Sequence, residues 1–323
     1  MEPSRPAAGC TIKDRVPARC IRVTLLIAAA VLSPAAQKPS GTQIVLLGTG
    51  TPAIEPDRSA ASTAIVVNGA AYLIDFGPGV IRRAKAAQLK GIDALDPVKI
   101  QTAFVTHLHS DHTAGYPDLI FTPWVVGRKE PLTVYGPKGI RAMTGHVLEA
   151  WQEDVSVRNN GLEHNFPHHV PGAYKVNAHE IEPGVVFRDG NITVKAFRVP
   201  HGEWENAFGY RFETPGRTIV IAGDTGPSAS VVENCNGCDV LIHEVYTLAS
   251  FRKSTPQWQA YAVKYHTSTK ELAELASKAR PGLLILHHQM YGRNGLSTEK
   301  DLEREMRELY HGRFVSGHDL DVY

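Results

Sequence analysis

Residues 100–112 read Ile-Gln-Thr-Ala-Phe-Val-Thr-His-Leu-His-Ser-Asp-His, a run typical of a buried strand followed by a polar cluster. The cluster places four metal-competent side chains in six positions: His107, His109, Asp111 and His112. These four side chains cannot all be ordinary core groups, because burying so many polar atoms without partners would cost several kcal/mol. Side chains two residues apart point the same way at a strand end, and a following turn lets Asp111 and His112 face the same cavity. Imidazole and carboxylate are the ligands of zinc, manganese or iron in catalytic sites, so this stretch predicts a metal site.

One heptapeptide supplies too few ligands for two metals, and three further predicted strand ends offer more. They are residues 199–202 (Val-Pro-His-Gly), 221–226 (Ile-Ala-Gly-Asp-Thr-Gly) and 283–288 (Leu-Leu-Ile-Leu-His-His). The additional candidates are His201, Asp224 and one of His287 and His288, because neighbouring positions of a strand face opposite sides. These three segments follow the heptapeptide in the chain, and together they strengthen the prediction of a metal centre.

The remaining sequence alternates predicted strands and helices, as expected of an α/β protein. Strands are expected at 43–47, 63–68, 71–75, 98–106, 133–135, 193–199, 207–212, 218–222, 240–242 and 283–286, and helices at 80–90, 139–151 and 269–279. Asn68-Gly69 predicts a hairpin between the second and third strands. Residues 152–176 are polar and weakly periodic, which favours a loop or lid. Residues 41–323 are expected to form a single domain.

Segments along nearly the whole of this domain resemble the metallo-β-lactamase superfamily, and within it the transfer-RNA 3′-processing endonuclease (tRNase Z, or ribonuclease Z) and arylsulfatase-like branch. They are residues 47–50, 75–77, 106–112, 132–139, 200–202, 208–210, 223–225, 243–244 and 265–269, and the strand before His288. The resemblance implies a four-layer αββα sandwich, with the active site at one edge of its two sheets.

The resemblance also implies two divalent metal ions, most often zinc, held by seven side chains. One ion would be bound by His107, His109 and His201, the other by Asp111, His112 and His288, and both by Asp224. The family spacing favours His288 over His287. Asp75 is expected to steady a ligand imidazole or a loop of the site.

Two such ions would lower the pKa of a shared water and neutralise charge on the attacked group. Asp111 could also orient the resulting hydroxide. By resemblance, His266 would be the general acid that protonates the leaving oxygen, with Glu244 as its orienting partner. The residues alone leave other interpretations open: a surface histidine at a helix start for His266, and a structural role for Glu244.

Composition argues against a nucleic-acid partner. Residues 1–36 hold five of the 34 basic side chains and two of the 33 acidic ones, which leaves 29 basic and 31 acidic side chains in the rest of the chain. Transfer-RNA-processing members of the branch carry a protruding arm before the Gly-Asp-Thr segment, but only residues 211–222 separate Tyr210 from Gly223. We therefore expect a small-molecule ester or nucleotide substrate with a phosphodiester or sulfate-ester bond, and no strong nucleic-acid footprint.

Other functions on the same fold stay open. The alternatives are a β-lactam or lactone hydrolase, an iron-dependent oxidoreductase and an inactive binding module. The intact heptapeptide argues against iron, and the complete set of seven ligands argues against an inactive module. A homodimer is common in this branch.

The N-terminus predicts export. Arg15, Arg19 and Arg22 precede an apolar run at 23–32, and small residues that suit signal peptidase end at Ala36. The predicted signal peptide is therefore 1–36, and the mature protein is expected in the periplasm or medium, with no membrane segment after its removal.

Two of the four cysteines, Cys235 and Cys238, lie outside this signal. We expect them to be small buried side chains at a strand entrance, with a short-loop disulfide as the alternative.

Overall fold

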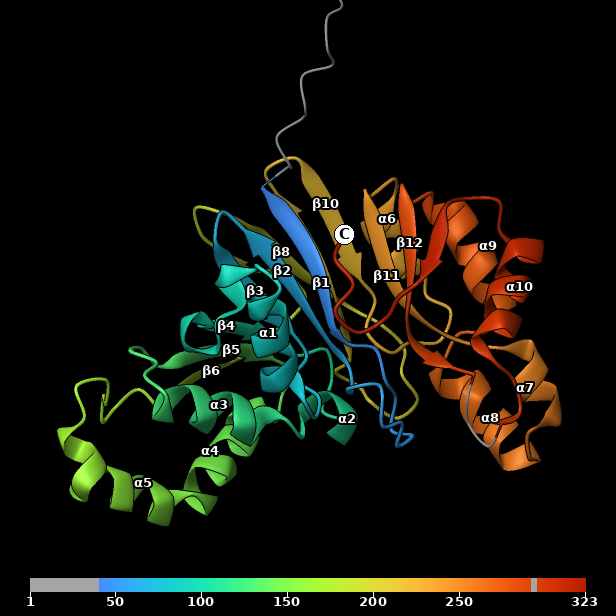
Figure 1. The fold of residues 1–323 in the computed structure, drawn as a ribbon. Helices are drawn as coiled ribbons and strands as arrows, with labels where there is room; N and C mark the ends of the chain where they lie inside the picture. Colours follow the sequence, from blue (N-terminus) through green and yellow to red (C-terminus); the bar gives the residue numbers. More distant parts are fainter. Residues whose placement is uncertain (1–40, 292–294) are drawn as a thin grey trace, which may run out of the picture. The chain divides into compact units, whose positions relative to one another are not determined.

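Two β-sheets form the centre of the structure, a computed structural model that describes residues 41–291 and 295–323 (Figure 1). The first sheet has the order β1 (Thr42–Gly48), β2 (Ser62–Val67), β3 (Ala70–Ile74), β4 (Thr102–Phe104), β5 (Leu132–Gly136), β6 (Val176–Glu180). The second has the order β13 (Phe314–Ser316), β12 (Leu283–Met290), β11 (Val240–Tyr246), β10 (Arg217–Ile221), β9 (Phe208–Thr214), β8 (Thr193–Arg198), β7 (Gly184–Arg188). All described residues lie in one compact unit.

Helices flank the two sheets, most of them on the outer faces. They are α1 (Val80–Leu89), α2 (Ser110–Thr113), α3 (Tyr116–Val125), α4 (Ile140–Ala150), α5 (Gln152–Asn160), α6 (Ala229–Cys235), α7 (Leu248–Lys253), α8 (Pro256–Tyr265), α9 (Thr269–Ala279) and α10 (Glu299–Leu309). Short 3₁₀ helices occur at Asp93–Leu95, Pro97–Lys99 and Leu162–Asn165.

Three apolar clusters hold these layers together. One lies between the sheets, where Ile65 and Phe104 of the first sheet meet Tyr210 and Ile219 of the second. Another packs α1, α3 and α4 on the outer face of the first sheet, and the last packs α6, α9 and α10 on the second. Burial of apolar surface on both faces of each sheet gives the order helix, sheet, sheet, helix. The predicted αββα sandwich is confirmed.

Strand direction explains why polar side chains gather at one edge. Strands β3 to β6 are parallel neighbours, as are β10 to β13. Because β9 is antiparallel to both β8 and β10, β8 runs in the same direction as β10. Carboxyl ends of parallel strands meet at the same edge, which is where open α/β sheets bind ligands.

Local sequence signals account for several elements. The predicted hairpin is confirmed, with β2 antiparallel to β3 and both turn residues in the left-handed region, Asn68 at φ 50° and Gly69 at φ 81°. Helix α9 begins with a capping box in which the Ser268 side chain accepts from the Glu271 amide while Glu271 accepts from the Ser268 amide. This cap fixes the start of α9 three residues after His266.

Other expectations about secondary structure are wrong. The strand predicted at 98–106 is shorter, because Pro97 starts a 3₁₀ helix and β4 covers only Thr102–Phe104. The loop or lid predicted at 152–176 begins with helix α5 and lies on the far side of the first sheet from α7 and α8 (Figure 1). Helices α2, α3, α6, α7, α8 and α10 were not predicted from sequence, although α10 is clearly amphipathic and buries Leu302 and Met306.

The two cysteines are joined. Cys235 ends α6, Asn236 and Gly237 form a left-handed turn, and Cys238 forms a disulfide with Cys235. The prediction of burial is confirmed for both side chains, whereas the preference for free thiols is wrong. The turn brings the two Cα atoms to 4.7 Å, a separation that the spacing in sequence does not reveal.

Candidate metal centre

The heptapeptide enters the site directly after β4. His107 and His109 lie in the extended segment that follows Phe104, and Asp111 and His112 lie on α2, which begins at Ser110. The Nε2 atom of His107 is 2.9 Å from Nδ1 of His109, so these two side chains point into the same space, as predicted. All four are buried except His109, which is half-buried.

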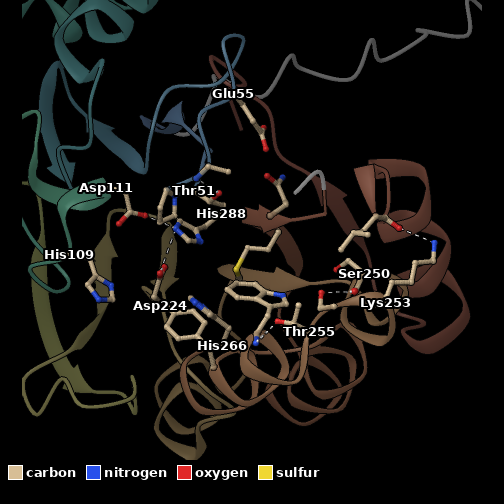
Figure 2. Close-up of a pocket in the computed structure, with 18 residues that line it drawn as sticks. Thr51, Glu55, His109, Asp111, Asp224, Ser250, Lys253, Thr255, His266 and His288 are labelled. Atoms are coloured by element: carbon tan, nitrogen blue, oxygen red, sulfur yellow. Dashed lines mark hydrogen bonds and ion pairs between the residues drawn. The ribbon is translucent and has the colours of Figure 1, made fainter. Parts of the chain in front are cut away.

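The structure brings all seven predicted ligand residues together. Three overlapping groups have potential ligand atoms within 4.8 Å of one another: His107, His109 and His201; His107, His112 and Asp224; Asp111, His112 and His288. One Asp224 oxygen is 3.5 Å from Nε2 of His112 and 3.5 Å from Nε2 of His288. Asp224 also groups with His107, so it lies between the two outer groups, and Figure 2 shows it facing Asp111 and His288 across one end of a cleft.

The donor set fits divalent cations. Nε2 of His112 is buried without a hydrogen-bond partner, while its Nδ1 is 2.8 Å from Asp75. Burial lowers the pKa of His201 to about 3, so this imidazole is neutral and keeps a lone pair. Burial also holds the pKa of His107 well below its usual value. Neutral imidazole is the form that binds zinc-like ions. At His112 burial by itself would lower the pKa, but the charges of Asp224 and Asp75 outweigh it and raise this pKa.

Asp75 and Thr106 support the ligands from behind. Asp75 accepts from the Thr106 amide at 2.8 Å, from the Thr106 hydroxyl at 2.9 Å, and from Nδ1 of His112. The same hydroxyl is 3.0 Å from Nδ1 of His107. One carboxylate thus orients two candidate ligands so that each directs Nε2 inward. The sequence predicted Asp75 in this role but not Thr106, whose only signal is its place immediately before His107.

His201 and His109 each make one further hydrogen bond. Nδ1 of His201 donates to the carbonyl of Tyr265 at 2.9 Å, and the ring of Tyr265 lies so close to Gly202 that a Cβ there would clash. The indole N–H of Trp204 donates to Nε2 of His109 at 2.7 Å. Trp204 was not predicted, because nothing in its local pattern distinguishes it from a core aromatic residue.

Backbone geometry decides between the two adjacent histidines on β12. His287 pairs with Glu244 of β11, and its Nε2 donates to the Gly48 carbonyl at 2.9 Å, away from the site. The next pair is Val245 with Gln289, so His288 is an extra residue in the ladder, with φ at 46°. Such a bulge re-aims a side chain. It brings Nε2 of His288 within 3.1 Å of Asp111, in agreement with the family spacing.

His266 and Glu244 form a buried pair beside the ligands. Nδ1 of His266 is 3.1 Å from Oε1 of Glu244, which also accepts from the backbone amides of Thr225 and Thr267. Burial raises the pKa of Glu244. Burial by itself would lower the pKa of His266, but the charge and hydrogen bond of Glu244 outweigh it and raise this pKa. The pair is therefore suited to hold a proton on His266 near neutral pH.

A cleft of about 710 Å³ leads from these groups to the surface (Figure 2). Its lining comes from the segment after β1, from α7 and α8, from the end of β12, and from the candidate site; it includes Thr51, Glu55, Asp111, Lys253, Trp258, Tyr261, His266 and Met290. Residues 152–176 do not line it, so the predicted lid is not in place over the site. This volume suits a ligand of nucleotide size.

Comparison with known proteins agrees with this geometry. Residues 71–289 match the family model of the beta-lactamase superfamily domain. The chain is 31% identical over 281 residues to "Ribonuclease Z" of Mycobacterium bovis BCG Pasteur, covering 86% of this chain and 96% of that protein. It is also 31% identical over 282 residues to "Ribonuclease Z" of Mycobacterium marinum, with the same coverage. The chain belongs to the beta-lactamase superfamily.

Solved structures give the same assignment. Human tRNase Z, short form, has a TM-score of 0.62 at 25% identity, covering 87% of this chain and 98% of that one. The metallo-beta-lactamase fold protein YhfI from Bacillus subtilis has a TM-score of 0.63 at 17% identity, with the same coverage, and supports the fold. Within the superfamily, this chain is a metal-dependent hydrolase of the tRNase Z-like phosphodiesterase type.

These comparisons correct the expected substrate. The prediction of a small-molecule ester substrate without a nucleic-acid footprint is wrong. The relatives that match along almost their whole length are named ribonuclease Z, and the human structure is a tRNase. Net charge misled the prediction, since it averages over the whole surface and says little about the groups around one cleft. The sulfate-ester alternative receives no support from these relatives.

Proposed function

We propose that this chain is an exported, dinuclear zinc-dependent phosphodiesterase that hydrolyses RNA. The observation that carries this proposal is the convergence of seven ligand-type side chains in three overlapping groups, the middle one containing Asp224, beside the buried pair His266 and Glu244. The similarity to proteins named ribonuclease Z supports RNA as the substrate class.

Each proposed ion has a complete set of protein ligands. One would be held by His107, His109 and His201, the other by Asp111, His112 and His288, and both by Asp224. A bound pair of divalent ions would lower the pKa of a shared water and neutralise charge on the phosphate. Zinc is favoured because imidazole nitrogens predominate among the ligands.

The remaining steps belong to this chain's own side chains. Asp111 has one oxygen 3.1 Å from His288 and lines the cleft, so it can accept a hydrogen bond from the attacking water. His266 lines the same cleft, and its Nδ1 is bonded to Glu244, which leaves Nε2 as the nitrogen that gives a proton to the leaving oxygen. Before that transfer, the buried carboxylate of Glu244 stabilises the proton on His266, because the negative charge of Glu244 faces the imidazole.

Recognition of RNA cannot rely on an arm between Tyr210 and Gly223. Strands β9 and β10 form a tight hairpin there, in which Thr214 pairs with Arg217. Contacts with RNA are therefore expected from the walls of the cleft.

Export is proposed from the sequence alone, because residues 1–36 lie outside the described residues. Among the described residues, no helix has the length and apolar character needed to cross a bilayer.

The test is an assay of purified mature protein on a precursor transfer RNA and on a single-stranded RNA oligonucleotide, with metal content measured in parallel. We expect hydrolysis that disappears with a chelator and returns with Zn²⁺. The control is Trp151→Ala, at an exposed position after α4, which should behave as the unaltered protein. Metal-replete protein that binds zinc but leaves both RNAs intact would overturn the proposed substrate.

A further inference from the structure

The segment that forms α7 and α8 differs in charge from the rest of the chain. Residues 247–270 contain four basic side chains, Arg252, Lys253, Lys264 and Lys270, and no aspartate or glutamate. Lys264 is paired with Glu203, whereas Nζ of Lys253 donates to the Leu296 carbonyl, a contact that leaves its positive charge unneutralised. Arg252 and Lys253 are exposed at the end of α7. Lys253 thus brings a positive charge to the lining of the cleft, with Arg252 next to it in α7, while the acidic Glu55 lines the segment after β1.

The same segment carries a row of aromatic rings. Trp258, Tyr261 and Tyr265 are spaced three and four residues apart, which places them on one face of α8. Their rings are stacked in order, with centroids 5.2 Å apart for the first pair and 4.4 Å for the second. Tyr261 also lies 5.4 Å from the ring of His266. The aromatic row thus leads from the surface to the proposed general acid.

Aromatic and basic groups occur together on one wall of the cleft. Trp258 and Tyr261 line it beside Lys253 and Thr255, while the candidate ligands line its other end. Figure 2 shows Lys253 and Thr255 on the far side of His266 from Asp111 and Asp224. Sites that bind single-stranded nucleic acid combine these features: aromatic faces on which bases stack, and positive charge that follows the backbone.

We propose that this aromatic–basic wall, formed by Lys253, Trp258 and Tyr261 with Arg252 next to it in α7, is the subsite for the nucleotide on the leaving-group side of the scissile phosphate. The inference rests on the proposed RNA hydrolysis. It assigns the leaving-group side because the aromatic row ends at His266, the group that protonates the leaving oxygen. The base stacks on Trp258, and the next phosphate lies near Arg252 and Lys253. The subsite supplies single-strand contacts in a chain whose β9–β10 hairpin leaves no room for an arm.

The first experiment measures RNA binding without turnover. The Kd of a single-stranded RNA oligonucleotide is measured by fluorescence anisotropy, with Asp224→Ala present in every protein to prevent cleavage. Adding Trp258→Ala should weaken binding about 5- to 150-fold, the range for loss of one base–aromatic stack. Trp258→Phe should restore most of it, because a phenyl face remains, and Trp151→Ala should have no effect. Equal Kd values for Trp258→Ala and its parent would overturn the subsite.

The second experiment locates the base. An oligonucleotide that lacks one base is tested with the abasic residue on either side of the cleavage site. Loss of the base on the leaving-group side should weaken binding by the parent as much as Trp258→Ala does, and combining both changes should cause little further loss, because they remove the same contact. If the combined loss of affinity equals the product of the two separate losses, the base lies elsewhere and the assignment is overturned.

The third experiment tests the charges. In the double variant Arg252→Gln and Lys253→Gln, the slope of log Kd against log salt concentration should fall by about 1.4, since each phosphate contact to a single strand contributes about 0.7. Lys90→Gln, at an exposed position after α1, is the matched control and should leave the slope unchanged. An unchanged slope in the double variant would remove these side chains from the subsite.

The two proposals fail separately. If the protein cleaves RNA, but neither Trp258→Ala nor the missing base changes RNA binding, the subsite is overturned and the proposed function stands. Binding that depends on Trp258, in a metal-replete protein that cleaves no RNA, would overturn the function and keep the subsite.

Discussion

Replacing Asp75 by asparagine tests whether one buried carboxylate orients ligands of both proposed ions. Asp75 is buried and accepts hydrogen bonds from the Thr106 amide, the Thr106 hydroxyl and Nδ1 of His112. Through the Thr106 hydroxyl it also fixes His107. Asparagine is the right probe because the φ of Asp75 is 60°, a conformation that asparagine tolerates and alanine does not.

The expected magnitude follows from these hydrogen bonds. Asparagine has only one accepting oxygen, so its NH₂ group must face a donor, either the Thr106 amide or Nδ1 of His112. If it faces His112, the imidazole must carry its proton on Nε2 instead of Nδ1 and loses the lone pair that would bind a cation. Loss of such a supporting partner typically costs 10- to 100-fold in metal affinity, about 1.4–2.7 kcal/mol. We expect zinc affinity of Asp75→Asn to fall within about this range.

The assay is competition for Zn²⁺ between the protein and a chromophoric chelator, with ions per chain counted by mass spectrometry. Asp189→Asn is the matched control, because Asp189 accepts hydrogen bonds from Tyr72 and from the backbone of a turn that does not contact the site. Thermal unfolding of the metal-free proteins checks that Asp75→Asn still folds. Zinc affinity equal to that of the unaltered protein would refute the argument that Asp75 orients the ligands.

Four other outcomes are expected. The protein should bind about two divalent ions per chain, and Asp224→Ala should lose metal and activity together; full activity in that variant would end the dinuclear proposal. His266→Ala should keep both ions and slow a natural phosphodiester by roughly 10²–10⁴, while a nitrophenyl analogue, whose leaving group needs no proton, loses far less; equal losses on both substrates would mean that His266 is not the acid. Because the charge of Glu244 raises the pKa of His266, Glu244→Gln should lower that pKa and move the alkaline limb of kcat/KM to lower pH, and a profile that stays in place would contradict the pairing. Mass spectrometry of the exported protein should find processing close to Ala36, and a soluble cytoplasmic chain that still begins at Met1 would contradict export.

Short-range sequence patterns predicted much of the site. The heptapeptide, His201 and Asp224 stand at strand ends that these patterns reveal, because an apolar run followed by glycine and polar residues is typical of a buried strand that ends in a turn. The αββα fold followed from the resemblance that those motifs support. The hairpin at Asn68 and Gly69 was predictable because its turn requires residues that tolerate positive φ.

Other features depend on pairing between distant segments, which no local pattern encodes. His288 faces the site rather than His287 because the ladder between β11 and β12 contains a bulge. Thr106 supports the ligands, and Trp204 contacts His109, only because the fold brings them beside Asp75 and His109.

The cleft wall was invisible in sequence for a related reason. Trp258 and Tyr261 belong to a short helix whose apolar positions suggest no particular partner, and their place beside His266 is set by α8 ending where β11 and α9 meet. Sequence determined which chemical groups this protein has and the strand ends that carry them. The tertiary structure alone decided which of those groups face one another, because side-chain direction at a strand end changes with a shift of one residue in register.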